Sequence, residues 1–378
     1  MFMMILLFTS LPKYSPLLTR LIGPFSFLVA LVGVTVIDSV AVELKYGSLE
    51  GSIQLHQEQN MNNSEPDSGF LNGLVELKYQ TDHLYNFSAN VGMHGGFNLW
   101  AMNEDDGQDA QGELLSQLNV AYENDTIQVI LGRQELEMLW LEDYHEALRL
   151  SYQPFESLGV RGGYSTRFAE ADVDGINDFE NIGDHGIWFL ELHHSNDRFP
   201  ATFSPYLLHI RDVHTAYGAT MEISQEEHFR LVFGYGFSDS NNPEFEDGFI
   251  ANTELGLYFN DLQFGGGYIQ TDKTGGSGSL DLLGDRINPL EEGNLIFEPD
   301  ARTPYAIIGY SQWGVDCSMV FAKTETGELS ETEFNLNLAY QFADSFEPFS
   351  IEFLYAIIDS GAREEDYNKF FITLIYEF

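Results

Sequence analysis

Arginine is concentrated in one part of this sequence. Seven of the ten arginines that follow residue 41 fall within one window of about a hundred residues, and no lysine occurs between Lys78 and Lys273. The seven are Arg133, Arg149, Arg161, Arg167, Arg198, Arg211 and Arg230. Guanidinium groups gathered along one wall of a water-filled passage select ions and orient dipolar solutes. The cluster therefore predicts electrostatic selection rather than a covalent reaction.

Acidic residues dominate the rest of the chain. Asp and Glu total 59 against 17 Lys and Arg, which gives a net charge of −42 over 378 residues. This charge excludes a general nucleic-acid-binding protein, because contacts to phosphate need positive groups. It also argues against docking on an anionic membrane surface. Long acidic segments occupy residues 170–185, 238–248 and 279–300.

The segment 170–185 follows the arginine-containing region most directly. If it folds toward the arginines, its carboxylates face them across a narrow gap and create a transverse field. These carboxylates are Asp172, Asp174, Asp178 and Glu180. The alternative is that all three acidic segments are solvated surface loops. The acid excess predicts cation preference, unless the arginines dominate at the narrowest point.

The elements that must position these groups are strands. From Val42 onward the chain consists of about 18 short segments of alternating polarity, separated by Gly, Asn, Asp and Pro clusters. Strands of about ten residues with one apolar face are typical of a transmembrane β-barrel. Very short turns, such as residues 123–125 and 260–262, alternate with long polar loops. We therefore predict an all-β antiparallel transmembrane barrel over residues 42–378, rather than a soluble β-protein whose apolar faces pack inward.

Strand alternation assigns a direction to each arginine once the apolar faces are turned to lipid. An arginine on the lipid face at mid-depth would cost about 2–4 kcal/mol, so the lumen is preferred. Arg149 then points inward, opposite Leu148, Leu150 and Tyr152. The same reasoning places Arg161 and Arg167 opposite Val160, Gly162 and Tyr164, Arg211 opposite Tyr206, Leu208 and Ile210, and Arg230 opposite Leu231, Phe233 and Tyr235.

Both ends of the chain fit an exported barrel. Lys13 and Arg20 precede an apolar run, and Ser39-Val40-Ala41 offers the small residues that a signal peptidase reads. Residues 1–41 are therefore predicted to be a signal peptide; an uncleaved anchor helix is the alternative, although the apolar run is short for a span. At the other end, the strand KFFITLIYEF finishes on Phe378, so it must pair with the first strand to close the cylinder.

A terminal Phe after alternating hydrophobic residues also looks like the signal read by the barrel assembly machinery of the outer membrane. Residues 130–155, ILGRQELEMLWLEDYHEALRLSYQPF, resemble the OprD-like group of Opr porins. The matching residues are Gly132, Arg133, Gln134, Leu136, Asp143, Tyr144, His145, Glu146 and Ala147. The resemblance implies an 18-stranded barrel in the bacterial outer membrane that passes small solutes. It also implies an arginine track along one pore wall and a monomer rather than a trimer.

Other chemical groups suggest no cofactor or catalytic site. Cys317 is the single cysteine, which excludes a disulfide framework and a thiolate metal cluster. His193 and His194 are adjacent, so on a strand they face opposite sides. Asp143, His145 and Glu146 are expected to make structural hydrogen bonds. The acidic stretches DVDGINDFE and NEDDGQDAQGE lack the spacing of a dedicated calcium loop and predict incidental Ca²⁺ binding only.

The sequence thus predicts a porin, a passive channel for ions and small hydrophilic solutes, with Arg133, Arg149, Arg161, Arg167, Arg211 and Arg230 facing the acidic loops. Outer-membrane lipid and the assembly machinery are its expected partners. An export channel or an adhesin built on the same barrel is the alternative. A barrel hydrolase fits less well, because no Ser-His or Asp-His set is evident on neighbouring segments.

Overall fold

The structure is a computed structural model that describes residues 42–44, 46–62, 66–196, 200–225, 228–241, 246–327, 329–343, 346–361 and 366–378. The predicted signal peptide, residues 1–41, and Arg198 lie outside these ranges. The regular structure of the described part consists of β-strands and two short 3₁₀ helices, η1 (Gln108–Ala110) and η2 (Leu280–Leu283). Within those ranges, helices long and apolar enough to span a membrane are absent.

The strands follow one another in chain order. Strands β1 to β8 are Val42–Leu44, Gly47–Asn62, Ser68–Thr81, Phe87–Ala101, Gly112–Glu123, Ile127–Glu135, Tyr144–Phe155 and Leu158–Ala169. Strands β9 to β14 are Glu180–Asn181, Ile187–Asn196, Ala201–Ile210, His214–Gln225, Phe229–Ser240 and Gly248–Phe259. Strands β15 to β20 are Leu262–Thr271, Arg302–Gln312, Val315–Glu325, Ser330–Gln341, Phe349–Asp359 and Tyr367–Glu377.

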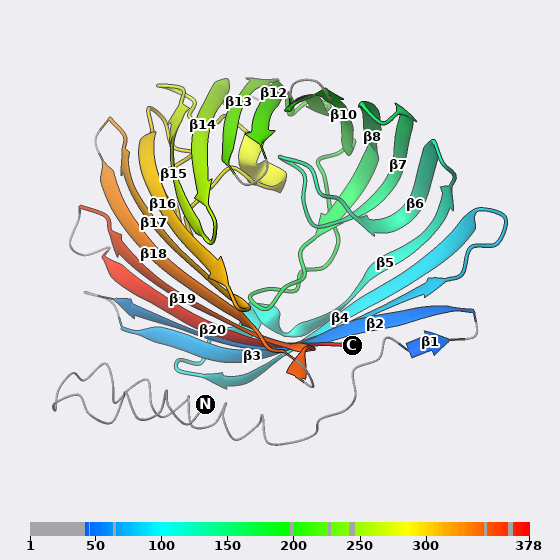
Figure 1. Cartoon of the computed structure of the whole chain (residues 1–378), viewed down its shortest axis with the longest axis horizontal. Coiled ribbons are helices and arrows are strands. Elements are labelled where there is room, and N and C mark those ends of the chain that lie inside the picture. Colours follow the sequence, from blue (N-terminus) through cyan, green and yellow to red (C-terminus); the bar gives the residue numbers. More distant parts are fainter. Residues whose placement is uncertain are drawn as a thin grey trace. The chain divides into compact units, whose positions relative to one another are not determined.

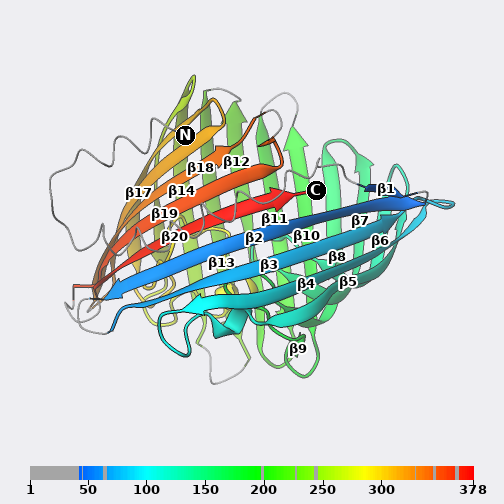
Figure 2. The ribbon, with the colours of Figure 1, turned by 90° about the horizontal axis from the view of Figure 1, so that it is seen from below.

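Eighteen of these strands close into an antiparallel barrel, as the sequence predicts (Figure 1). Each pairs with its neighbour in the chain, except that β8 pairs with β10 and the two-residue β9 lies at the edge of β8. The final strand β20 pairs with β2 from Ser52↔Glu377 to Asn62↔Tyr367, and Figure 2 shows the two side by side. This closure explains why the chain can end within a strand, since every ladder group finds a partner.

The outer surface of the barrel carries a band of apolar side chains. On β7, Leu148 and Leu150 are 47% and 48% exposed, whereas the alternate residues Ala147 and His145 are buried. Comparable exposed residues recur on the other strands, among them Leu118, Phe203, Phe233, Phe264, Ile308 and Phe321. Water does not stabilise so extensive an apolar surface, but hydrocarbon does.

The two ends of the barrel differ in the length of their connections. Short turns lie at the end where β20 finishes: Asn260 and Trp313 begin two of them with positive φ angles of 54° and 57°, as tight hairpin turns require. Long connections lie at the opposite end, including residues 170–186 between β8 and β10 and residues 272–301 between β15 and β16. The predicted alternation of short turns and long loops is confirmed.

The two long loops fold into the ring of strands rather than outward (Figure 1). The 272–301 loop packs Leu280, Leu290 and Ile296 against the turn 136–143 and the inner faces of several strands. We call this buried cluster the apolar plug; its wall side includes Phe189, Tyr206, Leu208, Ile210, Ile250, Ile269 and Tyr305. The barrel therefore has apolar residues on both faces where the plug lies.

This plug reverses the orientation predicted for β11. Tyr206, Leu208 and Ile210 are 3–8% exposed and face the plug, whereas Leu207 is 41% exposed on the outer face. The prediction that Arg211 faces the lumen from β11 is wrong: Arg211 lies in the turn after this strand and is 67% exposed. The alternation of polar and apolar residues predicts the position of this strand correctly. Its apolar side, however, faces the apolar plug inside the barrel and not the lipid.

A buried hydrogen bond links the turn 136–143 to the wall through the plug. The indole Nε1 of Trp140 donates to the Tyr206 hydroxyl at 2.7 Å. Changing Trp140 to Phe is expected to lower the free energy of unfolding by about 1–3 kcal/mol, because the buried hydroxyl loses a partner. Urea unfolding in lipid vesicles measures this. The exposed Trp313, changed to Phe, is the control; equal effects of the two changes would contradict the assignment.

Candidate permeation pathway

Two of the arginines predicted to face the lumen, Arg149 and Arg161, lie in adjacent positions on the inner wall. In the ladder between β7 and β8, Ser151 pairs with Arg161 and Arg149 pairs with Gly163, so the two guanidinium groups share a face one step apart. Arg149 Nη2 donates to Gln128 Oε1 at 3.1 Å, and Arg161 Nη2 donates to Glu191 Oε2 at 2.6 Å. We call Arg149 and Arg161 the arginine row.

Arg230 also faces inward but is closely compensated. Its guanidinium lies 3.0 Å from Glu222 Oε2 and 2.9 Å from Glu254 Oε1, on the strands to either side. The Tyr305 hydroxyl donates to the second oxygen of Glu254 at 2.9 Å, which fixes that carboxylate. Two carboxylates around one guanidinium leave a net negative patch, so Arg230 adds little positive field to the lumen.

Arg133 and Arg167 are not part of the arginine row. Their guanidinium groups contact Glu146 and Phe179, where the 170–186 loop joins the barrel wall. Both bind Glu146 Oε1, at 2.9 Å from Arg133 Nη2 and 3.2 Å from Arg167 Nη1. Their guanidinium carbons lie 4.3 and 5.7 Å from the centre of the Phe179 ring. Charge and ring contacts together fix the loop where it leaves β8.

A β-bulge explains why Arg167 does not follow Arg161. Ala147 pairs with Ser165 but Glu146 pairs with Arg167, so Thr166 is an extra residue on β8. One extra residue reverses the inward and outward phase of everything after it. The prediction that Arg161 and Arg167 share a face is therefore wrong.

The tip of the 170–186 loop reaches the far side of the lumen. Asn72 Nδ2 on β3 donates to the Val173 carbonyl at 3.0 Å, and Asp174 Oδ1 lies 3.4 Å from His56 Nε2 on β2. Asp172 Oδ1 accepts the backbone N–H groups of Asp174 and Gly175, which shapes this turn. Asp178 and Glu180, nearer the loop's return to the wall, are exposed.

Buried acids on β2 and β18, with one lysine on β20, form a wall that sequence reasoning missed. Glu333 accepts the N–H groups of Glu291, Glu292 and Gly293 of the 272–301 loop, at 3.0, 3.1 and 2.9 Å. Lys369 on β20 lies 3.3 Å from Glu58, 3.2 Å from Glu291 and 3.0 Å from Glu292. A signal was present: in SETEFNLN, Glu331, Glu333 and Asn335 alternate as one polar face.

The two charged walls stand opposite one another. Strands β7 and β8, which carry the arginine row, lie across the ring from β18, which carries Glu331 and Glu333 (Figure 1). Beyond β19, strands β20 and β2 continue the acidic wall with Lys369 and Glu58. The acidic wall carries a net negative charge, because the single ammonium group of Lys369 is shared by three carboxylates, those of Glu58, Glu291 and Glu292. A solute between these walls experiences a field directed across the channel.

The junction between the turn 136–143 and the 272–301 loop is rich in acid. Glu142 pairs with Arg286 and accepts the backbone N–H of Asp285 at 3.2 Å. Burial, reinforced by the neighbouring Glu142 and other carboxylates, raises the pKa of both Asp143 and Asp285 to about 6. These two loop carboxyls therefore lose most of their charge in mildly acidic solution.

The histidines noted in the sequence make structural contacts. His145 is fully buried between the Ser165 hydroxyl at 2.9 Å and the Glu142 carbonyl at 2.8 Å, as a structural role predicts. His194 Nδ1 lies 3.0 Å from the Ser157 carbonyl, whereas His193 Nδ1 lies 3.3 Å from the Ser204 hydroxyl. The two adjacent rings thus bind separate partners.

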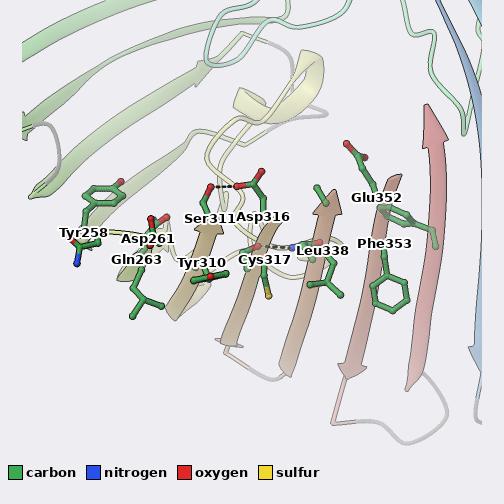
Figure 3. A pocket seen from close by; sticks show the side chains of 17 residues that line it. Tyr258, Asp261, Gln263, Tyr310, Ser311, Asp316, Cys317, Leu338, Glu352 and Phe353 are labelled. Atoms are coloured by element: carbon green, nitrogen blue, oxygen red, sulfur yellow. Dashed lines mark hydrogen bonds between the residues drawn. The ribbon is translucent and has the colours of Figure 1, made fainter. Parts of the chain in front are cut away.

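A cavity of about 550 Å³, lined by both polar and apolar side chains, lies at the short-turn end of β14 to β19 (Figure 3). Its inward-facing lining includes Gln263, Ser318, Asn337 and Glu352, from four different strands. Asp261 and Asp316 stand at its rim near the turns. A space of this size accommodates a small molecule.

Comparison with known proteins links this architecture to one group of channels. Family models and curated proteins give no match to the sequence. OccAB4 of Acinetobacter baumannii superposes with a TM-score of 0.76 at 13% identity, covering 89% of this chain and 99% of that one. OpdQ of Pseudomonas aeruginosa gives 0.73 at 12%, covering 87% and 97%.

The outer membrane protein opdK of Pseudomonas aeruginosa gives a TM-score of 0.75 at 11% identity, covering 89% of this chain and 99% of that one. All three similarities extend over nearly the whole length of the known structure, so the barrel and its strand order are shared. At this level of identity they establish the fold, not the solute. The chain therefore has the fold of the OprD/Occ porins, which is the fold that the resemblance of residues 130–155 implies.

Proposed function

We propose that this protein is an outer-membrane porin that lets ions and small hydrophilic solutes diffuse across the membrane without a chemical step. The observation that carries the proposal is a closed 18-stranded barrel with an apolar outer band and charged, polar inner walls. An apolar exterior fits lipid, and a polar interior fits water. The likeness to the OprD/Occ channels supports the same function.

The two ends of the chain would serve export and membrane insertion. Residues 1–41 would direct the chain out of the cytoplasm, and the strand ending at Phe378 would be read by the barrel assembly machinery. Because β20 pairs with both β19 and β2, its insertion completes the cylinder. The short turns, beside which β20 ends, would then face the periplasm, and the long loops the exterior.

Selectivity would arise between the arginine row and the acidic wall. Acidic groups outnumber basic ones in the chain, and Arg230 is enclosed by two carboxylates, so we expect an overall preference for cations. Arg149 and Arg161 oppose this preference. Asp174, Asp178 and Glu180 contribute from the 170–186 loop, and solutes that carry both charges would be oriented across the channel.

Neutralising the arginine row should make the channel more cation-selective. We expect the double change Arg149→Gln and Arg161→Gln to shift the zero-current potential under a salt gradient further toward the cation value, because two opposing charges leave the lumen. The control double change is Arg302→Gln with Lys323→Gln. It removes the same charge from side chains that are about half exposed near the strand ends.

A shift in the row variant that exceeds the control supports the assignment. Equal shifts would mean that only total charge matters and that the row is not at the narrow part. If the native channel is instead anion-selective and the row variant loses this selectivity, the protein is still a porin, but the arginine row is its selectivity filter. A folded barrel with no permeability would contradict the proposed function itself.

A further inference from the structure

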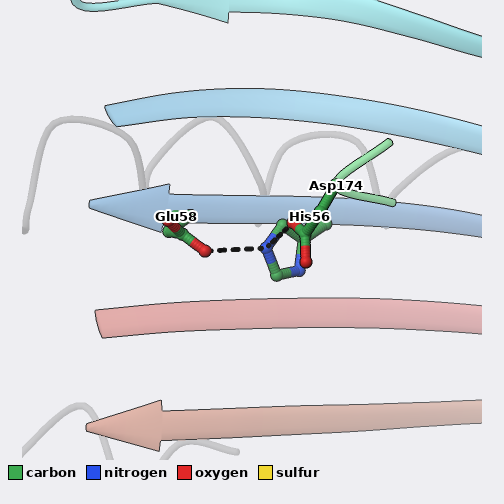
Figure 4. Close-up of side chains that lie close together, drawn as sticks. All are labelled: His56, Glu58 and Asp174. Carbon is green, nitrogen blue, oxygen red and sulfur yellow. Dashed lines mark ion pairs between the residues drawn. The ribbon is translucent and has the colours of Figure 1, made fainter. Parts of the chain in front are cut away.

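Three potential metal ligands meet where the tip of the 170–186 loop touches the wall. They are His56 and Glu58 on β2 and Asp174 at the loop tip (Figure 4). His56 Nε2 lies 3.4 Å from Asp174 Oδ1 and 3.9 Å from Glu58 Oε2, and all three ligand atoms lie within 4.8 Å of one another. Around an ion with bonds of about 2.1 Å, tetrahedral ligands are about 3.4 Å apart.

His56 is the buried member that points into this cluster. Only 3% of its side chain is exposed, and within the described residues its Nε2 makes no hydrogen bond. Its other nitrogen, Nδ1, lies 2.8 Å from the Thr373 hydroxyl on β20. A proton on Nδ1 donated to this hydroxyl leaves the Nε2 lone pair directed at two carboxylates. Such a contact to the second nitrogen is how metal-binding histidines are oriented.

The surroundings favour a cation between these groups. A lone pair facing two carboxylates is repulsive unless a proton or a metal ion lies between them. Glu291 and Glu292 add negative charge nearby, and Lys369 is the cation shared among them and Glu58. Lys369 can stay bound to Glu291 and Glu292 if Glu58 turns toward an ion. Glu58 is itself 6% exposed, so its charge is poorly screened by water.

We propose that His56, Glu58 and Asp174 bind one divalent cation of the zinc type, which fastens the tip of the 170–186 loop to β2. One imidazole and two carboxylates suit Zn²⁺ or Co²⁺, and water can complete the coordination. The ion would join strand β2 to the loop whose tip crosses the lumen. Binding requires only the folded barrel, so the proposal stands apart from the proposed function.

The test is a titration of purified, folded, metal-free protein with Co²⁺ at neutral pH, followed by its visible absorption, and then displacement by Zn²⁺. We expect saturation near one equivalent. His56→Gln and Asp174→Asn should each weaken binding by at least about tenfold, since each removes a ligand. Asp174 lies in a loop, so its variant tests the site even if the His56 variant folds poorly.

Two control variants separate the site from incidental binding. His209 makes a similar contact to a hydroxyl, 2.9 Å from Thr215, and His209→Gln should leave the affinity unchanged. Asp178→Asn removes the same charge from the same loop and should also have no effect. Absence of saturable binding in the native protein, or equal affinity in Asp174→Asn and Asp178→Asn, would overturn the proposal and leave a proton as the occupant.

Discussion

Removing the tip of the 272–301 loop is expected to raise the single-channel conductance severalfold. The change deletes residues 278–296 and joins Ser277 to Phe297 through two glycines. A short link suffices, because the Ser277 N–H already donates to the Phe297 carbonyl at 2.9 Å. The deletion takes η2, Leu290 and Ile296 out of the apolar plug, so water replaces protein in the lumen.

The barrel itself should survive this deletion, because its ladders do not include the loop. Sheet content by circular dichroism and electrophoretic mobility before and after heating verify that it is folded. Conductance is then measured in planar bilayers against the native protein. An unchanged conductance from a folded barrel would mean that the 272–301 loop does not narrow the path that ions take.

The second large effect is expected at Glu333. Its carboxylate accepts three backbone N–H groups of the 272–301 loop and is 1% exposed. Changing it to Ala leaves those donors without this partner, which we expect to cost about 3 kcal/mol of loop attachment. Since 1.4 kcal/mol is a factor of ten, the detached loop should be about a hundredfold more populated.

Limited proteolysis measures this detachment directly, because Arg286 within the loop is a site for trypsin. Cleavage there should be about a hundredfold faster in Glu333→Ala, if opening is fast relative to cleavage. Glu325→Ala, an exposed glutamate at the end of β17 that pairs with Lys323, is the control. Similar cleavage rates in the two variants would show that Glu333 is not an anchor.

The barrel is predictable from sequence because its signals are local. Period-two alternation and turn residues recur along the chain, and each strand pairs with its neighbour. The terminal KFFITLIYEF is the clearest case: its pattern already required a partner for the last strand, and β2 provides it. Closure by neighbouring strands needs no long-range information apart from this one pairing.

Side-chain direction was less predictable, for two physical reasons. First, the loops that fill the lumen give β11 an apolar inner face, so Tyr206 and Leu208 point inward although they resemble lipid-facing residues. Second, a bulge at Thr166 reverses the phase before Arg167. Neither the apolar plug nor the bulge can be recognised from the alternation of polar and apolar residues along a single strand. Arg149 and Arg161 alternate with the exposed Leu148 and Leu150, as the pattern predicts, because the ladder between β7 and β8 stays in register from Ala147↔Ser165 to Tyr152↔Val160.

The partners of the charged residues depend on which strands and loops meet. Glu333 and the backbone of residues 291–293 are about forty positions apart in the chain. Asp174 meets His56 only because a loop crosses the lumen. Sequence reasoning named Asp174 as a pore carboxylate, but its histidine partner could not be derived from composition or spacing.

Single-channel recording of the purified native barrel in a planar lipid bilayer, across a range of KCl concentrations, shows directly whether this barrel conducts ions. An open, water-filled path between the arginine row and the acidic wall predicts discrete current steps whose size rises with salt concentration. Protein that is folded and inserted, yet passes no current at any concentration, would contradict the claim that this barrel is a channel.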